Sequence, residues 1–148
     1  MMEKVIALYE KEAANEAAYD AAEAANDQAA MEAAREQHKA NCQAARDNGK
    51  DFCYMLRLYT DMKERGNELI DLNDVDDYRV AEVIEILLRF GVQRFTFSST
   101  WSSAISAVWE ISKHGYKLDG MVQINGKYPK ILTHEFEKIP AFVFDINE

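Results

Sequence analysis

The spacing of apolar residues changes near residue 50, and each half of the chain predicts different elements. Residues 5–46 are dominated by alanine, which recurs in pairs about four residues apart, and they contain no proline. Because alanine is the best helix former, this pattern predicts a long helix with a narrow, smooth stripe that a second helix can approach closely. That second helix is expected over residues 50–65, where apolar residues again follow helical spacing: Phe52, Met55, Leu56, Tyr59 and Met62.

The segment Asp47-Asn48-Gly49 separates the two helical patterns. Asparagine and glycine tolerate left-handed backbone angles, so the segment predicts a turn and a helical hairpin. A continuous helix through Gly49 is the alternative, because one interior glycine costs only about 1 kcal/mol relative to alanine. The chain is therefore divided into residues 1–66, a helical hairpin or long helix, and residues 67–148, a compact α/β portion that forms one folding unit with the helices.

From residue 67 onwards the apolar pattern alternates between helical and strand periods. It predicts two helices, over residues 76–90 and 101–114, and two strands, over residues 93–98 and 117–124. The helix over 101–114 is expected to bury a bulky face made of Trp101, Ala104, Ile105, Val108 and Ile111. Asn125-Gly126 is a strong signal for a hairpin turn, and a last strand is expected over residues 141–147.

Together these elements predict an α+β fold. A strand, a helix and a second strand with short connections form a βαβ unit, so strands 93–98 and 117–124 are expected to run parallel with a right-handed crossover. The C-terminal β-hairpin then adds antiparallel strands at one edge. The result is a small mixed sheet covered by the two helices of the second half, beside the alanine-rich helix.

The charge of the chain narrows the class of partner. Its 148 residues include 26 acidic and 17 basic side chains, which gives a formal net charge of -9. Such a charge repels nucleic acid and favours a basic protein partner. No window approaches the roughly 18 apolar residues of a membrane-spanning helix, and no export signal is recognisable. Cys42 and Cys53 form no CxxC pair, so a cytoplasmic location without membrane attachment is expected.

The acidic residues gather in two places, and both are candidate partner-binding surfaces. One is a row at helical spacing in the alanine-rich segment: Glu12, Glu16, Asp20, Glu23 and Asp27. The other is the acidic loop that leads into helix 76–90 and caps it: Asp71, Asp74, Asp76 and Asp77. A solvated face that keeps an alanine-rich helix soluble is the plainer interpretation. The alternative is a rod of negative charge that imitates a nucleic acid backbone and docks on a basic groove.

A cluster of hydroxyl residues, Ser98, Ser99 and Thr100, follows strand 93–98 directly. The carboxyl end of a strand that leads into a helix is where open α/β sheets bind anions. The cluster lacks the glycines of a phosphate loop and of a nucleophile elbow, so helix capping is the favoured interpretation. A small anion- or nucleotide-binding module that uses the amino end of helix 101–114 is the second functional hypothesis.

Metal and catalytic signatures are weak. His38 and Cys42 lie four residues apart on one helical face and could form half of a zinc site, but no second ligand pair is visible. Residues 71–77 superficially resemble a calcium loop, yet the glycine and glutamate that such a loop requires are missing. The sequence therefore predicts no metal, no cofactor, no catalytic residue and no enzymatic activity.

Three stretches carry a resemblance to a known family: MKERGNELID at 62–71, RFTFSSTWSSAISAVW at 94–109, and HGYKLDGMVQING at 114–126. From about Tyr59 to Ile146 the chain resembles a family of small uncharacterised proteins carried by mobile genetic elements of gut bacteria. Accessory proteins of such elements often protect them from host defences. The resemblance therefore implies an inhibitor similar to anti-CRISPR or anti-restriction proteins, one that acts on a host defence nuclease.

Overall fold

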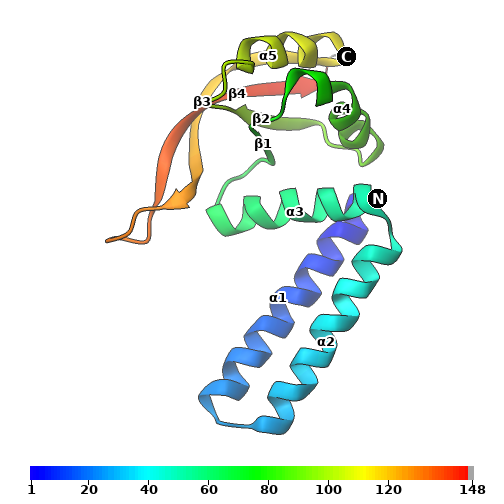
Figure 1. The fold of residues 1–148 in the computed structure, drawn as a ribbon, viewed down its shortest axis with the longest axis vertical. Coiled ribbons are helices and arrows are strands. Elements are labelled where there is room, and N and C mark those ends of the chain that lie inside the picture. The colour runs from blue at the N-terminus through cyan, green and yellow to red at the C-terminus, as the bar shows by residue number, and fades with distance from the viewer. Residues whose placement is uncertain (147–148) are drawn as a thin grey trace. The chain divides into compact units, whose positions relative to one another are not determined.

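The structure is a computed structural model that describes residues 1–146. The chain divides into two compact units, Met1–Tyr59 and Thr60–Glu148. In the first unit, α1 (Met2–Ala24) and α2 (Gln28–Asp47) lie side by side as a helical hairpin (Figure 1). The next helix, α3 (Lys50–Arg65), begins in the first unit and ends in the second.

The alanine-rich segment is a hairpin of its own, so the prediction of one long helix over residues 5–46 is wrong. The helix breaks at Asn26, whose φ of 51° lies in the left-handed region that asparagine tolerates. The Asp27 carboxylate then accepts the N–H of Ala30 at 3.1 Å and caps α2. Two consecutive residues with strong turn and cap preferences therefore outweigh the helix propensity of the alanines around them.

The predicted turn between residues 47 and 49 is confirmed. Helix α2 ends at Asp47, α3 begins at Lys50, and Gly49 between them has a φ of +94°. Only glycine adopts this angle without strain, so the local sequence determines where α2 ends and α3 begins.

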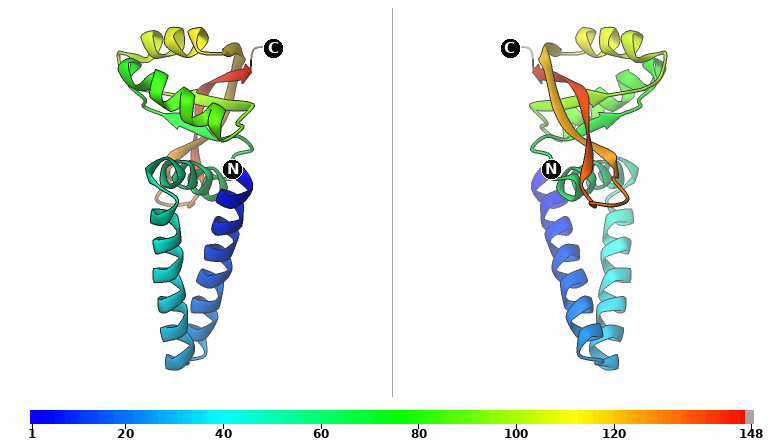
Figure 2. Two further views of the ribbon diagram at one scale, coloured as in Figure 1. Left: turned by 90° about the vertical axis from the view of Figure 1, so that its right-hand side faces the viewer. Right: turned by 90° about the vertical axis from the view of Figure 1, so that its left-hand side faces the viewer.

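The second unit is built on a mixed four-stranded sheet, and the predicted α+β fold is correct. The strand order is β1-β2-β4-β3, with bounds Asp71–Asn73 for β1, Arg94–Ser98 for β2, Tyr116–Pro129 for β3 and Phe136–Ile146 for β4. Strands β1 and β2 are parallel, whereas β4 is antiparallel to both of its neighbours. Figure 2 shows α4 (Val80–Arg89) and α5 (Ala104–Lys113) on one side of this sheet, and a short 3-10 helix, η1 (Asp77–Arg79), precedes α4.

Aromatic rings fill the core between the sheet and these helices. Phe95 of β2 stacks on Phe144 of β4 at 5.5 Å and meets the edge of Tyr116 at 4.8 Å. Leu87 of α4 and Ile111 of α5 are buried with them. Each such side chain contributes roughly 1.5–3 kcal/mol on burial, so this layer is the main source of stability in the unit.

The two strands of the predicted βαβ unit run parallel, as expected, but they are not neighbours in the sheet. Strands β2 and β3 are both antiparallel to β4, so they run parallel to each other, but β4 lies between them. The chain reverses at residues 130–135, where the Lys130 N–H donates to the Glu135 carbonyl at 2.7 Å, and not at Asn125-Gly126. Strand β4 begins at Phe136, earlier than the predicted 141, and the predicted end at Asn147 lies outside the described residues.

Asn125 and Gly126 lie inside β3 because they make tertiary contacts. The Asn67 side chain donates to the Asn125 carbonyl at 3.0 Å and accepts the Asn125 N–H at 2.9 Å, as a neighbouring strand would. The Asn125 side chain donates to the Arg65 carbonyl at 2.5 Å and accepts from Lys138. A Cβ on Gly126 would lie 3.1 Å from the Glu137 carbonyl oxygen. Here asparagine connects two segments and glycine permits a close approach of two strands.

We expect Asn125→Ala to lower the free energy of unfolding by about 1–3 kcal/mol, because it leaves the partly buried Arg65 carbonyl without its donor. Urea denaturation measures this. Asn48→Ala is the matched control, since Asn48 also donates to a carbonyl, that of Ala44, but at an exposed site. Equal losses for the two variants would contradict the structural role of Asn125.

Candidate functional site

The outer side of α5 carries bulky apolar residues that face solvent. Trp101, Ile105 and Trp109 expose 45%, 85% and 64% of their surface. Ile105 and Trp109 are four residues apart and lie along one side of α5, whereas Trp101 lies in the turn that precedes the helix. The prediction that Trp101 and Ile105 are buried is therefore wrong. The buried side of α5 is instead formed by Ala107 and Ile111, because small alanine lets the helix approach the sheet closely.

Strand β3 extends this apolar area. Leu118 and Met121 are 46% and 61% exposed, and they pair with Phe144 and Phe142 of β4. Residues directly opposite each other on neighbouring strands point to the same face, so both lie on the face that α5 covers, and α5 packs against β3. We name the five residues Trp101, Ile105, Trp109, Leu118 and Met121 the α5 surface.

The α5 surface is large for an exposed apolar area. At about 200 Å² for a fully exposed large side chain, the five residues present roughly 600 Å². For comparison, the largest contiguous apolar patch of a typical monomer is roughly 300–600 Å² and is often functional.

An acidic loop lies beside the α5 surface. Residues 77–79 form η1, which packs against α5, and the Asp74 carboxylate accepts the Thr100 N–H at 3.1 Å. Asp76 precedes η1 and Asp77 begins it, and both are partly exposed. Three of the four predicted loop acids, Asp74, Asp76 and Asp77, therefore form a negatively charged rim next to the apolar residues.

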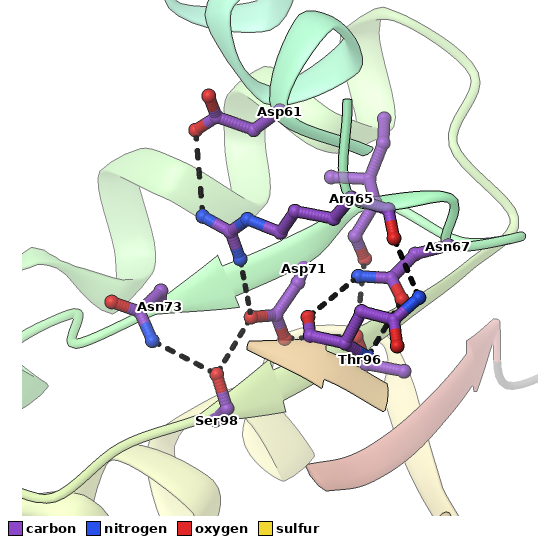
Figure 3. Close-up of polar contacts among 9 residues, drawn as sticks. Asp61, Arg65, Asn67, Asp71, Asn73, Thr96 and Ser98 are labelled. Carbon is purple, nitrogen blue, oxygen red and sulfur yellow. Dashed lines mark hydrogen bonds and ion pairs between the residues drawn. The ribbon is translucent and has the colours of Figure 1, made fainter. Parts of the chain in front are cut away.

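Asp71, the fourth predicted loop acid, is not part of this rim. Its side chain is only 3% exposed and accepts hydrogen bonds from Thr96 at 2.8 Å and from Ser98 at 2.6 Å (Figure 3). Burial raises the pKa of Asp71 above its ordinary value, although the two hydroxyl donors and Arg65 act in the opposite direction. Asp71 is therefore a structural residue, and its assignment to partner binding is corrected.

Arg65 joins Asp71 to the end of α3. Its guanidinium lies 3.7 Å from a carboxylate oxygen of Asp71 and 3.7 Å from one of Asp61, and Asn73 donates to Ser98 at 3.0 Å (Figure 3). This buried polar network fastens the last turn of α3 to β1 and β2. In the sequence, Thr96 and Ser98 alternate with Phe95 and Phe97. This alternation could have indicated the polar network, because a strand with a buried polar face requires polar partners.

The residues of the hydroxyl cluster make contacts other than the predicted helix cap. Ser98 binds Asp71, and the Ser99 hydroxyl accepts the Trp101 N–H at 3.1 Å in the turn before α5. In the described part of the chain, Ser103 at the start of α5 makes no side-chain capping bond, so the capping prediction is wrong for this helix. The Thr100 N–H, which an anion would need, already donates to Asp74, and this disfavours an anion site.

The five acidic residues of the row predicted in the alanine-rich segment have different contacts. Glu12 binds His38 and accepts the Asn41 side-chain amide at 2.5 Å, while Asp27 caps α2. Glu16, Asp20 and Glu23 are exposed. Of the five predicted residues, these three present their carboxylates to solvent from one side of the helix.

The comparison with known proteins assigns a family. The chain belongs to a family described as a domain of unknown function (DUF7698), whose model matches residues 54–146. Neither the curated proteins nor the solved structures contain a match to the chain. The matched range includes the whole sheet, the acidic loop and the α5 surface, whereas α1 and α2 precede it.

Two further findings concern metal ligands and membrane-spanning helices. Across residues 1–146, no cluster of three or more histidine, cysteine, aspartate or glutamate side chains is arranged to hold a metal ion. Within the same residues, no helix has both the length and the apolar character needed to span a membrane.

Proposed function

We propose that the protein is a protein-binding inhibitor that docks on a basic surface of its partner through the α5 surface. The observation that carries the proposal is the exposure of Ile105 and Trp109 along one side of α5, and of Trp101 just before the helix, next to the acidic loop. Stable protein interfaces have an apolar, aromatic-rich centre and a polar rim, and the energy of binding concentrates in such aromatic anchors.

The charge of the chain defines the chemistry of the partner. The net charge of -9 and the rim of Asp74, Asp76 and Asp77 favour a partner whose apolar contact site is surrounded by lysine and arginine. Nucleic-acid-binding grooves are basic surfaces of this kind. We therefore propose a defence nuclease as the class of partner, with the acidic rim in the place of nucleic acid phosphates; the resemblance to proteins of mobile genetic elements supports this choice.

The exposed acids of α1 have a different role in the proposal. Glu16, Asp20 and Glu23 add negative charge that attracts a basic partner over distance, without being part of the contact. Such charges mainly raise the rate of association, and their effect is screened within roughly 10 Å at 0.1 M salt.

Charge reversal tests the role of the acidic rim. Asp76→Lys with Asp77→Lys should slow association with the partner about tenfold at low salt and less at high salt, because steering between charges is screened by ions. Stability should change by under about 0.5 kcal/mol for each exposed substitution. Stopped-flow or surface-binding kinetics at two salt concentrations measures the effect.

Glu85→Lys is the matched control, since Glu85 is an exposed acid on α4 outside the rim. Nucleic acid bound by the partner should compete with the wild-type protein. If reversal of Glu16 and Glu23 shortens the lifetime of the complex while reversal of Asp76 and Asp77 changes neither its lifetime nor its rate of association, the contact lies on α1 and the proposal is wrong.

A further inference from the structure

Five polar side chains form a continuous hydrogen-bonded network across the α1–α2 hairpin. Gln37 donates to Asn41 at 2.7 Å, and Asn41 donates to one carboxylate oxygen of Glu12 at 2.5 Å. The other oxygen of Glu12 binds Nδ1 of His38. Nε2 of His38 lies 3.5 Å from Sγ of Cys42, one turn further along α2. A thiol, an imidazole and a carboxylate are thus connected in the order of a nucleophile, a base and the group that orients the base.

This order has a chemical consequence. A carboxylate at Nδ1 holds the proton of the neutral imidazole on that nitrogen, so the lone pair of Nε2 faces the Cys42 thiol. A base so oriented can accept the thiol proton and leave a nucleophilic thiolate. Cys42 and His38 are both accessible to solvent. The other cysteine has a different environment, because the Cys53 thiol donates to the Ala45 carbonyl at 3.3 Å.

A groove opens beside His38 in the same unit. It has a volume of about 600 Å³, and its walls carry charges of both signs: Glu16 and Asp20 from α1, Arg35 and Lys39 from α2. Glu12 and His38 also line it, so the groove leads to the base of the triad. Carboxylates on one wall and cations on the other suit a small zwitterionic molecule that has both ammonium and carboxylate groups.

We propose that Cys42 is a reactive thiol that undergoes disulfide exchange with small zwitterionic peptide disulfides, the chemical class of oxidised glutathione. His38 takes the proton of Cys42, and the thiolate attacks one sulfur of the disulfide. A new bond forms between Cys42 and that sulfur while the original disulfide bond breaks. The departing thiolate takes the proton from His38, so Cys42 is oxidised and half of the small disulfide is reduced.

The reacting residues of this site are not part of the proposed contact surface. Glu12, His38 and Cys42 all lie before residue 54, outside the range that the family model matches, whereas the α5 surface lies inside it. Failure of one proposal therefore leaves the other unaffected.

Mass spectrometry of the full chain with oxidised glutathione tests the proposal, with Cys53 as the internal reference. At neutral pH, Cys42 should form the mixed disulfide about tenfold or more faster than Cys53, as expected for a thiol that is activated by a neighbouring base. In His38→Gln the rate at Cys42 should fall to that of Cys53, while the rate at Cys53 stays constant. Local unfolding would raise both rates, so the ratio separates activation from loss of structure.

The groove is tested with two disulfides of different charge. Arg35→Gln with Lys39→Gln should slow the reaction of Cys42 with oxidised glutathione several-fold and leave its reaction with neutral hydroxyethyl disulfide unchanged. Equal slowing with both reagents would overturn the assignment of the groove. Equal rates at Cys42 and Cys53 in the wild-type chain, or a His38→Gln variant that reacts as fast as the wild type, would overturn the proposal.

Discussion

Asp71→Ala is expected to lower the free energy of unfolding by about 3–5 kcal/mol, the cost of removing one member of a buried ion pair. The Asp71 carboxylate accepts from Thr96 and Ser98 and lies 3.7 Å from the buried Arg65 guanidinium. Without it, Arg65 keeps the partly exposed Asp61, also at 3.7 Å. The buried Ser98 hydroxyl loses its acceptor, and the Thr96 hydroxyl keeps the longer bond to the Ile70 carbonyl at 3.5 Å.

Urea denaturation measures this loss, and two further variants define its origin. Asp119→Ala removes an exposed ion pair with Arg94 and should cost under about 1 kcal/mol. The double variant Arg65→Met with Asp71→Leu should be more stable than Asp71→Ala, because it leaves no uncompensated buried charge. If Asp71→Ala costs no more than Asp119→Ala, the network does not hold α3 to the sheet.

Trp109→Ala is expected to weaken partner binding by about 2 kcal/mol, roughly a 30-fold loss of affinity, as for an aromatic anchor at the centre of an interface. Lys113 lies over the Trp109 ring, with Nζ 5.5 Å from its centroid, and helps to hold the ring in place. The exposed position of the ring means that folding stability should change by under about 0.5 kcal/mol.

Tyr128→Ala and Leu88→Ala are the matched controls for Trp109→Ala. Both residues are large, apolar and exposed, and both lie outside the α5 surface, Tyr128 on β3 and Leu88 on α4. Titration calorimetry with the purified partner should show affinity unchanged in the controls. A loss of affinity in either control as large as that of Trp109→Ala would show that exposure of apolar residues, and not the α5 surface, determines binding.

The elements that could be predicted from the sequence are those that local chemistry determines. The turn at Gly49 follows from one backbone angle, and helix α4 and strand β2 follow from apolar periods that match what the structure buries. The α+β class followed from the same periods. In each case the deciding interaction lies within a few residues of the chain.

The features that could not be predicted depend on distant residues. Asn125-Gly126 has the sequence of a turn, but Asn67 and Glu137 determine its role inside β3. Asp71 looked like a loop acid, and only the pairing of β1 with β2 brings Thr96 and Ser98 to its carboxylate. The side of α5 that faces the sheet is fixed by Ala107, a residue whose small size gave no signal in the pattern of bulky residues.

Hydrogen exchange of the full chain, alone and bound to its purified partner, tests the proposed binding surface most directly. Backbone amides of residues 101–113 and 74–79 should exchange more slowly in the complex, because the partner covers α5 and the acidic loop that packs against it. Amides of α1 and α2 should exchange at the same rate in both states. Protection confined to residues 2–47, with no change along α5, would contradict the account and place the binding surface on the helical hairpin.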